Sequence, residues 1–162
     1  PFAGEIARWV HAFKYPSEGL ASLDPRPGAA LAALVADAAR RLTGEPPVLV
    51  APVPMHPHKR RERGFHPAGE LARTVASVLG ARVERRALQQ VRVTASQTGL
   101  ERPARRRNVR GAFEASAVLR GVECVALVDD VVTTGATLFE CARALRRAGV
   151  RSVVAVCAAR TL

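Results

Sequence analysis

The chain has 162 residues, which suits one domain with its own core, because a domain of this size buries roughly 70% of the surface that its unfolded chain exposes. The composition is 48% hydrophobic but only 4% aromatic, which favours helices with small side chains packed closely against a sheet. A formal net charge of +11 favours encounters with polyanions, either phosphorylated metabolites or nucleic acid. No apolar run approaches a membrane span and no signal peptide is evident, so we expect a cytoplasmic protein without membrane insertion.

The N-terminal part alternates helical patterns with turn signals. Apolar residues at three- and four-residue intervals predict a helix from Phe2 to about Lys14. The same spacing predicts a second helix over 31–42, which a glycine and two prolines end. Segments 15–19 and 24–28 are rich in proline and glycine, so they predict turns.

A short strand is predicted over 48–53. Pro52 lacks the amide donor that a sheet ladder needs, so the strand should finish there or leave that side unpaired. The next segment, 54–65, combines prolines with Lys59, Arg60 and Arg63 and predicts an irregular basic connection. In a parallel sheet this connection opens at the carboxyl edge, so these three cations are candidates to face a phosphate. The alternative is a solvated basic loop.

Histidines and cysteines do not predict a metal site here. His56, His58 and His66 are not accompanied by acids at ligand spacing on a regular element. The three cysteines lie far apart, each inside an apolar segment, and none belongs to a Cys-x-x-Cys pair. We therefore expect buried thiols, without a disulfide framework or a zinc site.

The middle of the chain contains a long stretch without periodicity. A helix is predicted from Pro67, a favoured first-turn residue, to Gly80, followed by a weakly alternating strand over 82–88. From 89 to 111 the periodicity disappears, and arginines crowd the second half. Such a stretch is usually disordered or a functional lid. A lid explains this segment, because a displacement reaction on a phosphorylated sugar must be shielded from water. Arginines of the lid, with Arg105 facing the sugar phosphate, would balance its charge. Nucleic-acid binding explains them nearly as well.

The last third alternates strand and helix. Residues 112–114 predict a short strand, 124–128 a buried strand, 138–148 a helix that ends at Gly149, and 152–158 a final buried strand rich in valine. This alternation predicts an α/β fold with a mostly parallel sheet and helices on both faces.

Two adjacent acids follow the strand at 124–128. Asp129 and Asp130 emerge where open α/β sheets bind ligands, and their oxygens accept hydrogen bonds from sugar hydroxyls or help to hold a divalent cation. Residues 133–137 then lie over the first turn of the next helix, whose unpaired amides and dipole suit a phosphate. The segment therefore predicts a site for a sugar phosphate. The alternative is an ordinary strand end with solvated acids and Thr137 as a helix cap.

The ten residues from Val128 to Thr137, VDDVVTTGAT, resemble the signature of type I phosphoribosyltransferases, which bind 5-phosphoribosyl-1-pyrophosphate (PRPP). The resemblance implies a type I phosphoribosyltransferase fold, and a catalytic pair, Asp129 and Asp130, that takes the ribose hydroxyls. The PRPP-binding residues that it implies are this pair with Val131, Val132, Thr133, Thr134, Gly135, Ala136 and Thr137. Mg²⁺ is expected to arrive with PRPP, with Asp129 and Asp130 as the candidate protein ligands.

Three further segments narrow the resemblance. In order along the chain, they are Phe13-Lys14-Tyr15, then Val53-Pro54 with Arg63-Gly64-Phe65, and then Gln97 with Arg105, Asn108, Gly111 and Phe113. Together they resemble the ComF family of phosphoribosyltransferase-like proteins, which includes competence proteins of bacterial DNA uptake and a GntX-like branch. The resemblance implies one domain over 1–162, with a small N-terminal hood contributed by about residues 1–25.

The chain departs from the family in two places. Family members commonly begin with a cysteine-rich zinc ribbon, and this chain, which starts at Pro1, has none, as expected of a fragment or of a chain without the ribbon's function. Where the family tends to show Asn-Gln after Arg-Gly-Phe, this chain has His66 and Pro67. The contact that the Asn-Gln pair makes is therefore in question.

Three functions remain open from the sequence. The first is an enzyme that transfers phosphoribosyl from Mg²⁺-PRPP to an unknown acceptor and releases pyrophosphate, whose charge Lys59, Arg60, Arg63 and Arg105 would offset. The second is a single-stranded DNA-binding competence factor without turnover, which uses the basic segments. The third is a PRPP-sensing regulator. A homodimer and partners from the competence machinery are compatible with all three.

Overall fold

The computed structural model describes residues 2–15, 26–94 and 102–160. Within these ranges, four parallel strands form the central sheet, in the order β2-β1-β5-β6. The strands are β1 (Leu49–Pro52), β2 (Arg82–Val83), β5 (Cys124–Val132) and β6 (Ser152–Arg160). β1 ends at Pro52, as its missing amide donor predicts.

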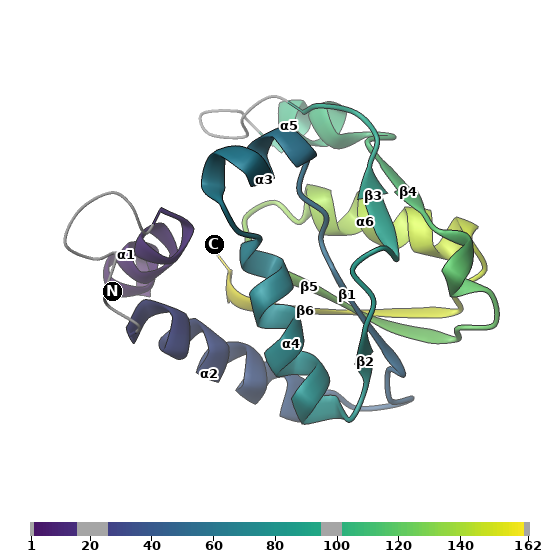
Figure 1. The fold of residues 1–162 in the computed structure, drawn as a ribbon, viewed down its shortest axis with the longest axis horizontal. Helices are drawn as coiled ribbons and strands as arrows, with labels where there is room; N and C mark the ends of the chain where they lie inside the picture. Colours follow the sequence, from purple (N-terminus) through teal and green to yellow (C-terminus); the bar gives the residue numbers. More distant parts are fainter. Residues whose placement is uncertain (1, 16–25, 95–101, 161–162) are drawn as a thin grey trace.

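Helices cover both faces of this sheet (Figure 1). On one face lie α2 (Arg26–Arg40) and α4 (Pro67–Leu79), and α1 (Phe2–Lys14) packs on α2. On the other face lies α6 (Ala136–Arg147). The predicted α/β fold, with a parallel sheet and helices on both faces, is therefore confirmed. None of the described helices is long and apolar enough to cross a membrane.

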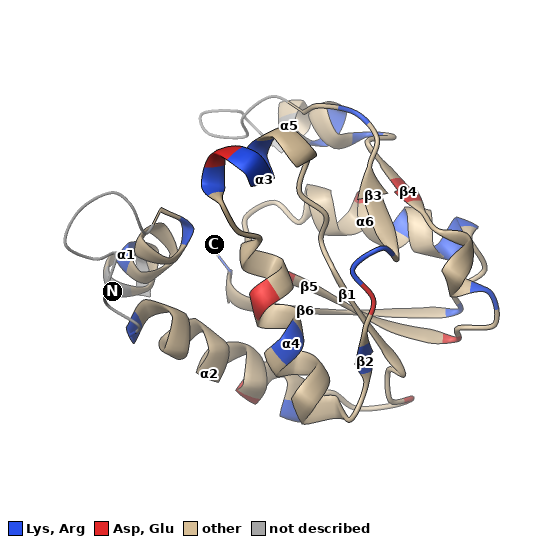
Figure 2. Cartoon of the chain, viewed as in Figure 1, with Lys and Arg blue, Asp and Glu red and all other residues tan. Residues whose placement is uncertain are grey.

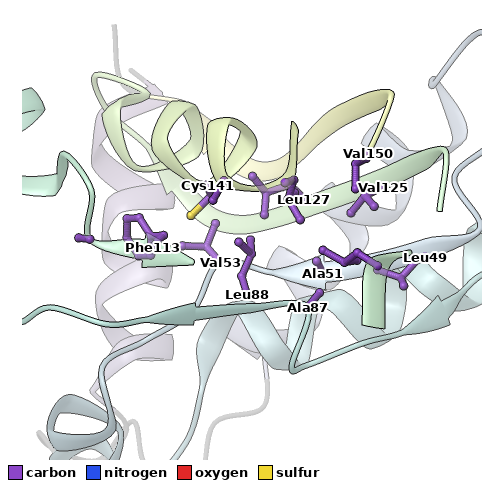
Figure 3. Close-up of a cluster of buried hydrophobic side chains, with 14 of the residues drawn as sticks. Leu49, Ala51, Val53, Ala87, Leu88, Phe113, Val125, Leu127, Cys141 and Val150 are labelled. Atoms are coloured by element: carbon purple, nitrogen blue, oxygen red, sulfur yellow. The ribbon is translucent and has the colours of Figure 1, made fainter. Parts of the chain in front are cut away.

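The alternation of side chains along β5 divides the core into two clusters. Val125 and Leu127 join Cys141 and Leu145 in the cluster on the α6 face (Figure 3). Ala126 and Val128 belong to the cluster on the opposite face, with α2 and α4. Successive residues of a strand point to opposite faces, which accounts for this division of the core.

A smaller unit packs on the α6 side of the sheet. Its antiparallel strands are β3 (Leu88–Gln90) and β4 (Phe113–Ala115), and β4 packs on α6. α5 (Arg102–Val109) also contacts α6, and a 3-10 turn, η2 (Ala117–Leu119), follows β4. The strand predicted over 82–88 is wrong as a single element, because its two ends belong to β2 and β3, which lie in different sheets.

Three helices begin inside segments for which the sequence predicts irregular structure. α2 begins at Arg26 within the predicted turn, α3 (Pro57–Arg63) replaces the predicted basic loop, and α5 lies within the predicted lid. Each has a proline among its first two residues. Proline suits a first turn, because its φ is already helical and its missing amide has no helical partner there. Counting these prolines as helix breakers made the predictions wrong.

Candidate functional site

Asp129 and Asp130 lie inside β5, not after it. The pairing between β5 and β1 ends with Val128 opposite Pro52, but the pairing between β5 and β6 continues to Val132. The prediction that the strand stops at Val128 is therefore wrong, because β6 holds it extended for four more residues. Beyond Val128, β5 has a paired neighbour on one side only, among the described strands.

The Asp129 carboxyl group lies near Cys141 of α6 and Cys157 of β6. Burial, followed by the charge of Asp129, raises the pKa of both thiols. Asp129 Oδ1 accepts the Asp130 amide at 2.9 Å. Burial, followed by the negative charge of Asp130, raises the pKa of Asp129 from 3.8 to about 8. This acid is therefore mainly protonated at neutral pH in this structure, and can then donate a hydrogen bond as well as accept one.

The raised pKa of Asp129 predicts how the free energy of unfolding changes with pH. The folded chain keeps a proton that the unfolded chain releases above 3.8, so the stabilisation is complete below 3.8 and is lost as the pH rises through about 8. The loss is at most about 1.4 kcal/mol for each pH unit. Asp129→Asn removes this titration, so its free energy of unfolding should rise relative to wild type between about pH 5 and about pH 8.5. Urea unfolding at each pH tests this, and parallel wild-type and Asp129→Asn profiles would contradict it.

Asp130 is largely buried, and both of its carboxylate oxygens have partners. Its side chain is only 9% exposed. Its Oδ1 accepts the amide of Val131 at 2.8 Å, and its Oδ2 pairs with the ammonium of Lys14 at 2.9 Å. A hydrogen bond between the Asp129 and Asp130 side chains also contributes to the raised pKa of Asp129, so the two acids lie close together within β5.

Gly135 shapes the loop between β5 and α6. It is the N-cap of α6, has a φ of 72° in the left-handed region, and provides no side-chain cap. Thr134 Oγ1 accepts the Ala136 amide at 3.4 Å, and Thr133 is exposed. Thr137 lies inside the helix, so the alternative in which it caps α6 is wrong. Because Gly135 has no side chain, the backbone at the start of α6 is open to close approach by an external anion.

The end of α1 meets the end of α3 over this part of the sheet. The ion pair between Lys14 and Asp130 joins α1 to β5, and Figure 1 shows α1 at the end of the sheet where β5 and β6 finish. The Arg63 guanidinium donates to the Tyr15 hydroxyl at 3.1 Å and lies 4.9 Å from the centre of the Tyr15 ring. Phe13 and Phe65 pack edge to face at 5.6 Å. Sequence reasoning missed Lys14 as a site residue, although it lies in a segment that carries the family resemblance.

The predicted phosphate-facing cations are placed differently from one another. Lys59 and Arg60 are exposed on α3, which Figure 2 shows as a mostly basic helix. Arg63 is half-buried against Tyr15, so its described contact is with the N-terminal helix. The side chain of Arg105, which begins the second turn of α5, lies outside the described residues.

His66 has a structural contact of its own. Its Nε2 lies 2.9 Å from the carbonyl oxygen of Val53, directly after β1, and burial lowers its pKa. The neutral ring therefore donates its Nε2 proton to that carbonyl. A Cβ on Gly69 would lie 3.0 Å from the ring, so this glycine makes room for the histidine. The departure from Asn-Gln thus ties the start of α4 to the end of β1.

The comparison with family models decides the family. The model of the phosphoribosyl transferase domain matches residues 25–161. This chain belongs to the phosphoribosyl transferase domain family. The N-terminal hood expected at about residues 1–25 precedes the match and remains a prediction.

Curated relatives in this family are named for DNA utilization and competence. The chain is 38% identical over 125 residues to the DNA utilization protein YhgH of Salmonella typhi, covering 76% of this chain and 55% of that protein. It is 33% identical over 121 residues to Competence protein F of Haemophilus influenzae, covering 74% of this chain and 53% of that protein. The resemblance to ComF-type phosphoribosyltransferases is confirmed. The chain spans about half the length of these relatives.

Solved structures support the same fold. The glutamine PRPP amidotransferase from B. subtilis, complexed with ADP and GMP, superposes with a TM-score of 0.56 at 20% identity, over 91% of this chain and 30% of that one. A structure described as the allosteric regulatory enzyme of purine biosynthesis gives a TM-score of 0.53 at 21% identity, over 91% of this chain and 29% of that one. At these identities the likeness concerns the fold alone.

Proposed function

We propose that this chain binds PRPP where β5 leads into α6, as a phosphoribosyltransferase-like protein of DNA utilization. The observation that carries the proposal is the left-handed N-cap Gly135, which places no side chain over the start of α6, shortly after the two acids of β5. In this proposal the 5′-phosphate lies against residues 133–137, because backbone amides and the helix dipole favour an anion there. Asp129 and Asp130 take the ribose hydroxyls.

The pyrophosphate part of PRPP belongs, in this proposal, near the basic residues that follow β1. Lys59 and Arg60 are exposed on α3. Arg105 would approach from α5. Such cations offset the charge that develops on pyrophosphate as it leaves the anomeric carbon. The acceptor of the phosphoribosyl group is not identified by any described side chain, and a PRPP sensor without turnover would use the same contacts.

Mg²⁺ fits this proposal as a companion of PRPP better than as an ion held by the protein alone. The described residues contain no group of three or more His, Cys, Asp or Glu that could hold a metal. One carboxylate oxygen of Asp130 is paired with Lys14, and the other accepts the amide of Val131. When bound, the ion would neutralise phosphate charge, with its remaining ligands from PRPP and water.

Calorimetry with PRPP and Mg²⁺ tests the proposal. We expect saturable heat for PRPP and a weaker signal for ribose 5-phosphate, because the latter lacks the pyrophosphate that the cations on α3 attract. Absence of heat with PRPP at millimolar concentration would contradict the proposal. A screen for pyrophosphate release with nucleobases and small amines then separates an enzyme from a sensor.

A single-stranded DNA-binding function is the second candidate. The exposed basic residues of α3 and α5 favour it, namely Lys59, Arg60, Arg61, Arg106 and Arg107. Their contacts would be to phosphates, because few aromatic side chains are available for base stacking. Affinity for an oligonucleotide should therefore fall steeply as salt concentration rises. A salt-independent affinity would contradict this candidate.

A further inference from the structure

Asp130, which is expected to bind a ribose hydroxyl, is covered by Lys14 at the end of the N-terminal helix α1. Both oxygens of Asp130 have partners, the amide of Val131 on Oδ1 and the ammonium of Lys14 on Oδ2. The Asp130 side chain is 9% exposed and that of Lys14 is 27% exposed. A hydroxyl that approaches from solvent therefore meets the Lys14 side chain before it meets the carboxylate.

Two other contacts hold the same end of α1 in place. Arg63 donates to and stacks on Tyr15, and Phe65 packs on Phe13. These contacts join the end of α1 to the end of α3 and to the segment after it, and they do not involve β5. When Lys14 leaves Asp130 these two contacts remain, so α1 can shift only as far as they allow and stays beside the site.

We propose that Lys14 is a positioning residue of the sugar site, which holds the Asp130 side chain and keeps α1 docked until a ribose hydroxyl replaces its ammonium at Oδ2. The inference rests on the proposed PRPP site. Sugar binding and the docking of α1 are then linked, because both use the same carboxylate oxygen. A ligand that displaces Lys14 shifts α1 to the extent that it prefers the shifted position.

The choice of lysine suits an ion pair that must be exchanged. Lys14 is one of only two lysines among the 25 basic residues of the chain. An ammonium is a single point charge on a flexible stem, whereas a guanidinium forms paired hydrogen bonds with both oxygens of a carboxylate. Arginine at this position would hold Asp130 more firmly against an incoming hydroxyl.

The single tryptophan of the chain provides the readout. Trp9 lies on α1 and is half-buried, so its fluorescence reports the position of this helix. PRPP with Mg²⁺ is titrated at about pH 8.5, above the raised pKa of Asp129, with heat and Trp9 emission followed in parallel. In the wild type, both signals should saturate at the same PRPP concentration.

The two lysines allow a matched comparison. Lys14→Met should keep the heat of binding, with an affinity at least equal to that of the wild type, but should lose most of the Trp9 response. Lys59→Met, which loses a cation near the proposed pyrophosphate position, should bind PRPP more weakly but should keep the Trp9 response at saturation. Lys14→Arg keeps the charge, but should bind PRPP several times more weakly than the wild type, because the firmer ion pair resists displacement.

The outcomes separate this inference from the proposed function. If PRPP gives neither heat nor a Trp9 change in the wild type, both fail together. If heat appears without a Trp9 change, or if Lys14→Met responds like the wild type, only the role of Lys14 fails. A loss of about tenfold or more in the affinity of Lys14→Met relative to the wild type would make Lys14 a direct ligand contact and overturn its displacement. An unchanged affinity in Lys14→Arg would also count against it.

Discussion

Replacing Asp130 with asparagine is expected to weaken PRPP binding by roughly 1.5–3 kcal/mol, which is about ten- to more than hundredfold in Kd. The carboxylate accepts a charge-assisted hydrogen bond from a sugar hydroxyl in the proposed complex, and a neutral amide oxygen accepts a weaker one. The uncharged asparagine side chain also cannot form the ion pair that Asp130 Oδ2 makes with the Lys14 ammonium at 2.9 Å. Calorimetry with PRPP and Mg²⁺ measures the change.

Asp37→Asn is the matched control for this substitution. Asp37 is exposed on α2 and pairs with Arg41 one turn away, at 2.8 Å. An exposed pair of this kind contributes little to stability, so its loss should leave both folding and PRPP affinity close to those of the wild type. Equal affinities of Asp130→Asn and Asp37→Asn, with both proteins folded, would remove Asp130 from the binding site.

Replacing Leu127 with alanine is expected to destabilise the fold by about 2–5 kcal/mol, through lost burial and the cavity that remains. Leu127 is 1% exposed and packs in the cluster between β5 and α6 (Figure 3). It lies two residues before Asp129 on the same face of β5, so the loss also loosens the strand that carries the site. The melting temperature should fall by roughly 5–15 °C for a domain of this size.

Val118→Ala serves as the control for the core substitution. Val118 is 42% exposed in the 3-10 turn after β4, where shortening the side chain leaves no closed cavity. Surface substitutions of this kind usually change stability by less than about 0.5 kcal/mol. If Leu127→Ala and Val118→Ala had the same melting temperature, the packing of α6 on β5 would differ from that in this structure.

Much of the fold follows from short stretches of sequence. The valine-rich run before Asp129, the small residues that follow and the apolar spacing after Gly135 predict strand, loop and helix in the order that the structure has. The alternation of strands and helices predicts the parallel sheet, which the pairing of β1, β5 and β6 confirms. These features are determined locally, because each depends on the order of side chains within one or two elements.

The sequence by itself determined the order of the elements and the position of the loop before α6, since strand, turn and helix signals lie within a few neighbouring residues. Only the tertiary structure decided how far β5 extends, because that length depends on its pairing with β6, and the extension places Asp129 and Asp130 inside the strand. It also decided that Lys14 meets Asp130 and that Arg63 turns to Tyr15. Partners so remote in the chain are chosen by the packing of α1 and α3 around the sheet, which no local pattern contains.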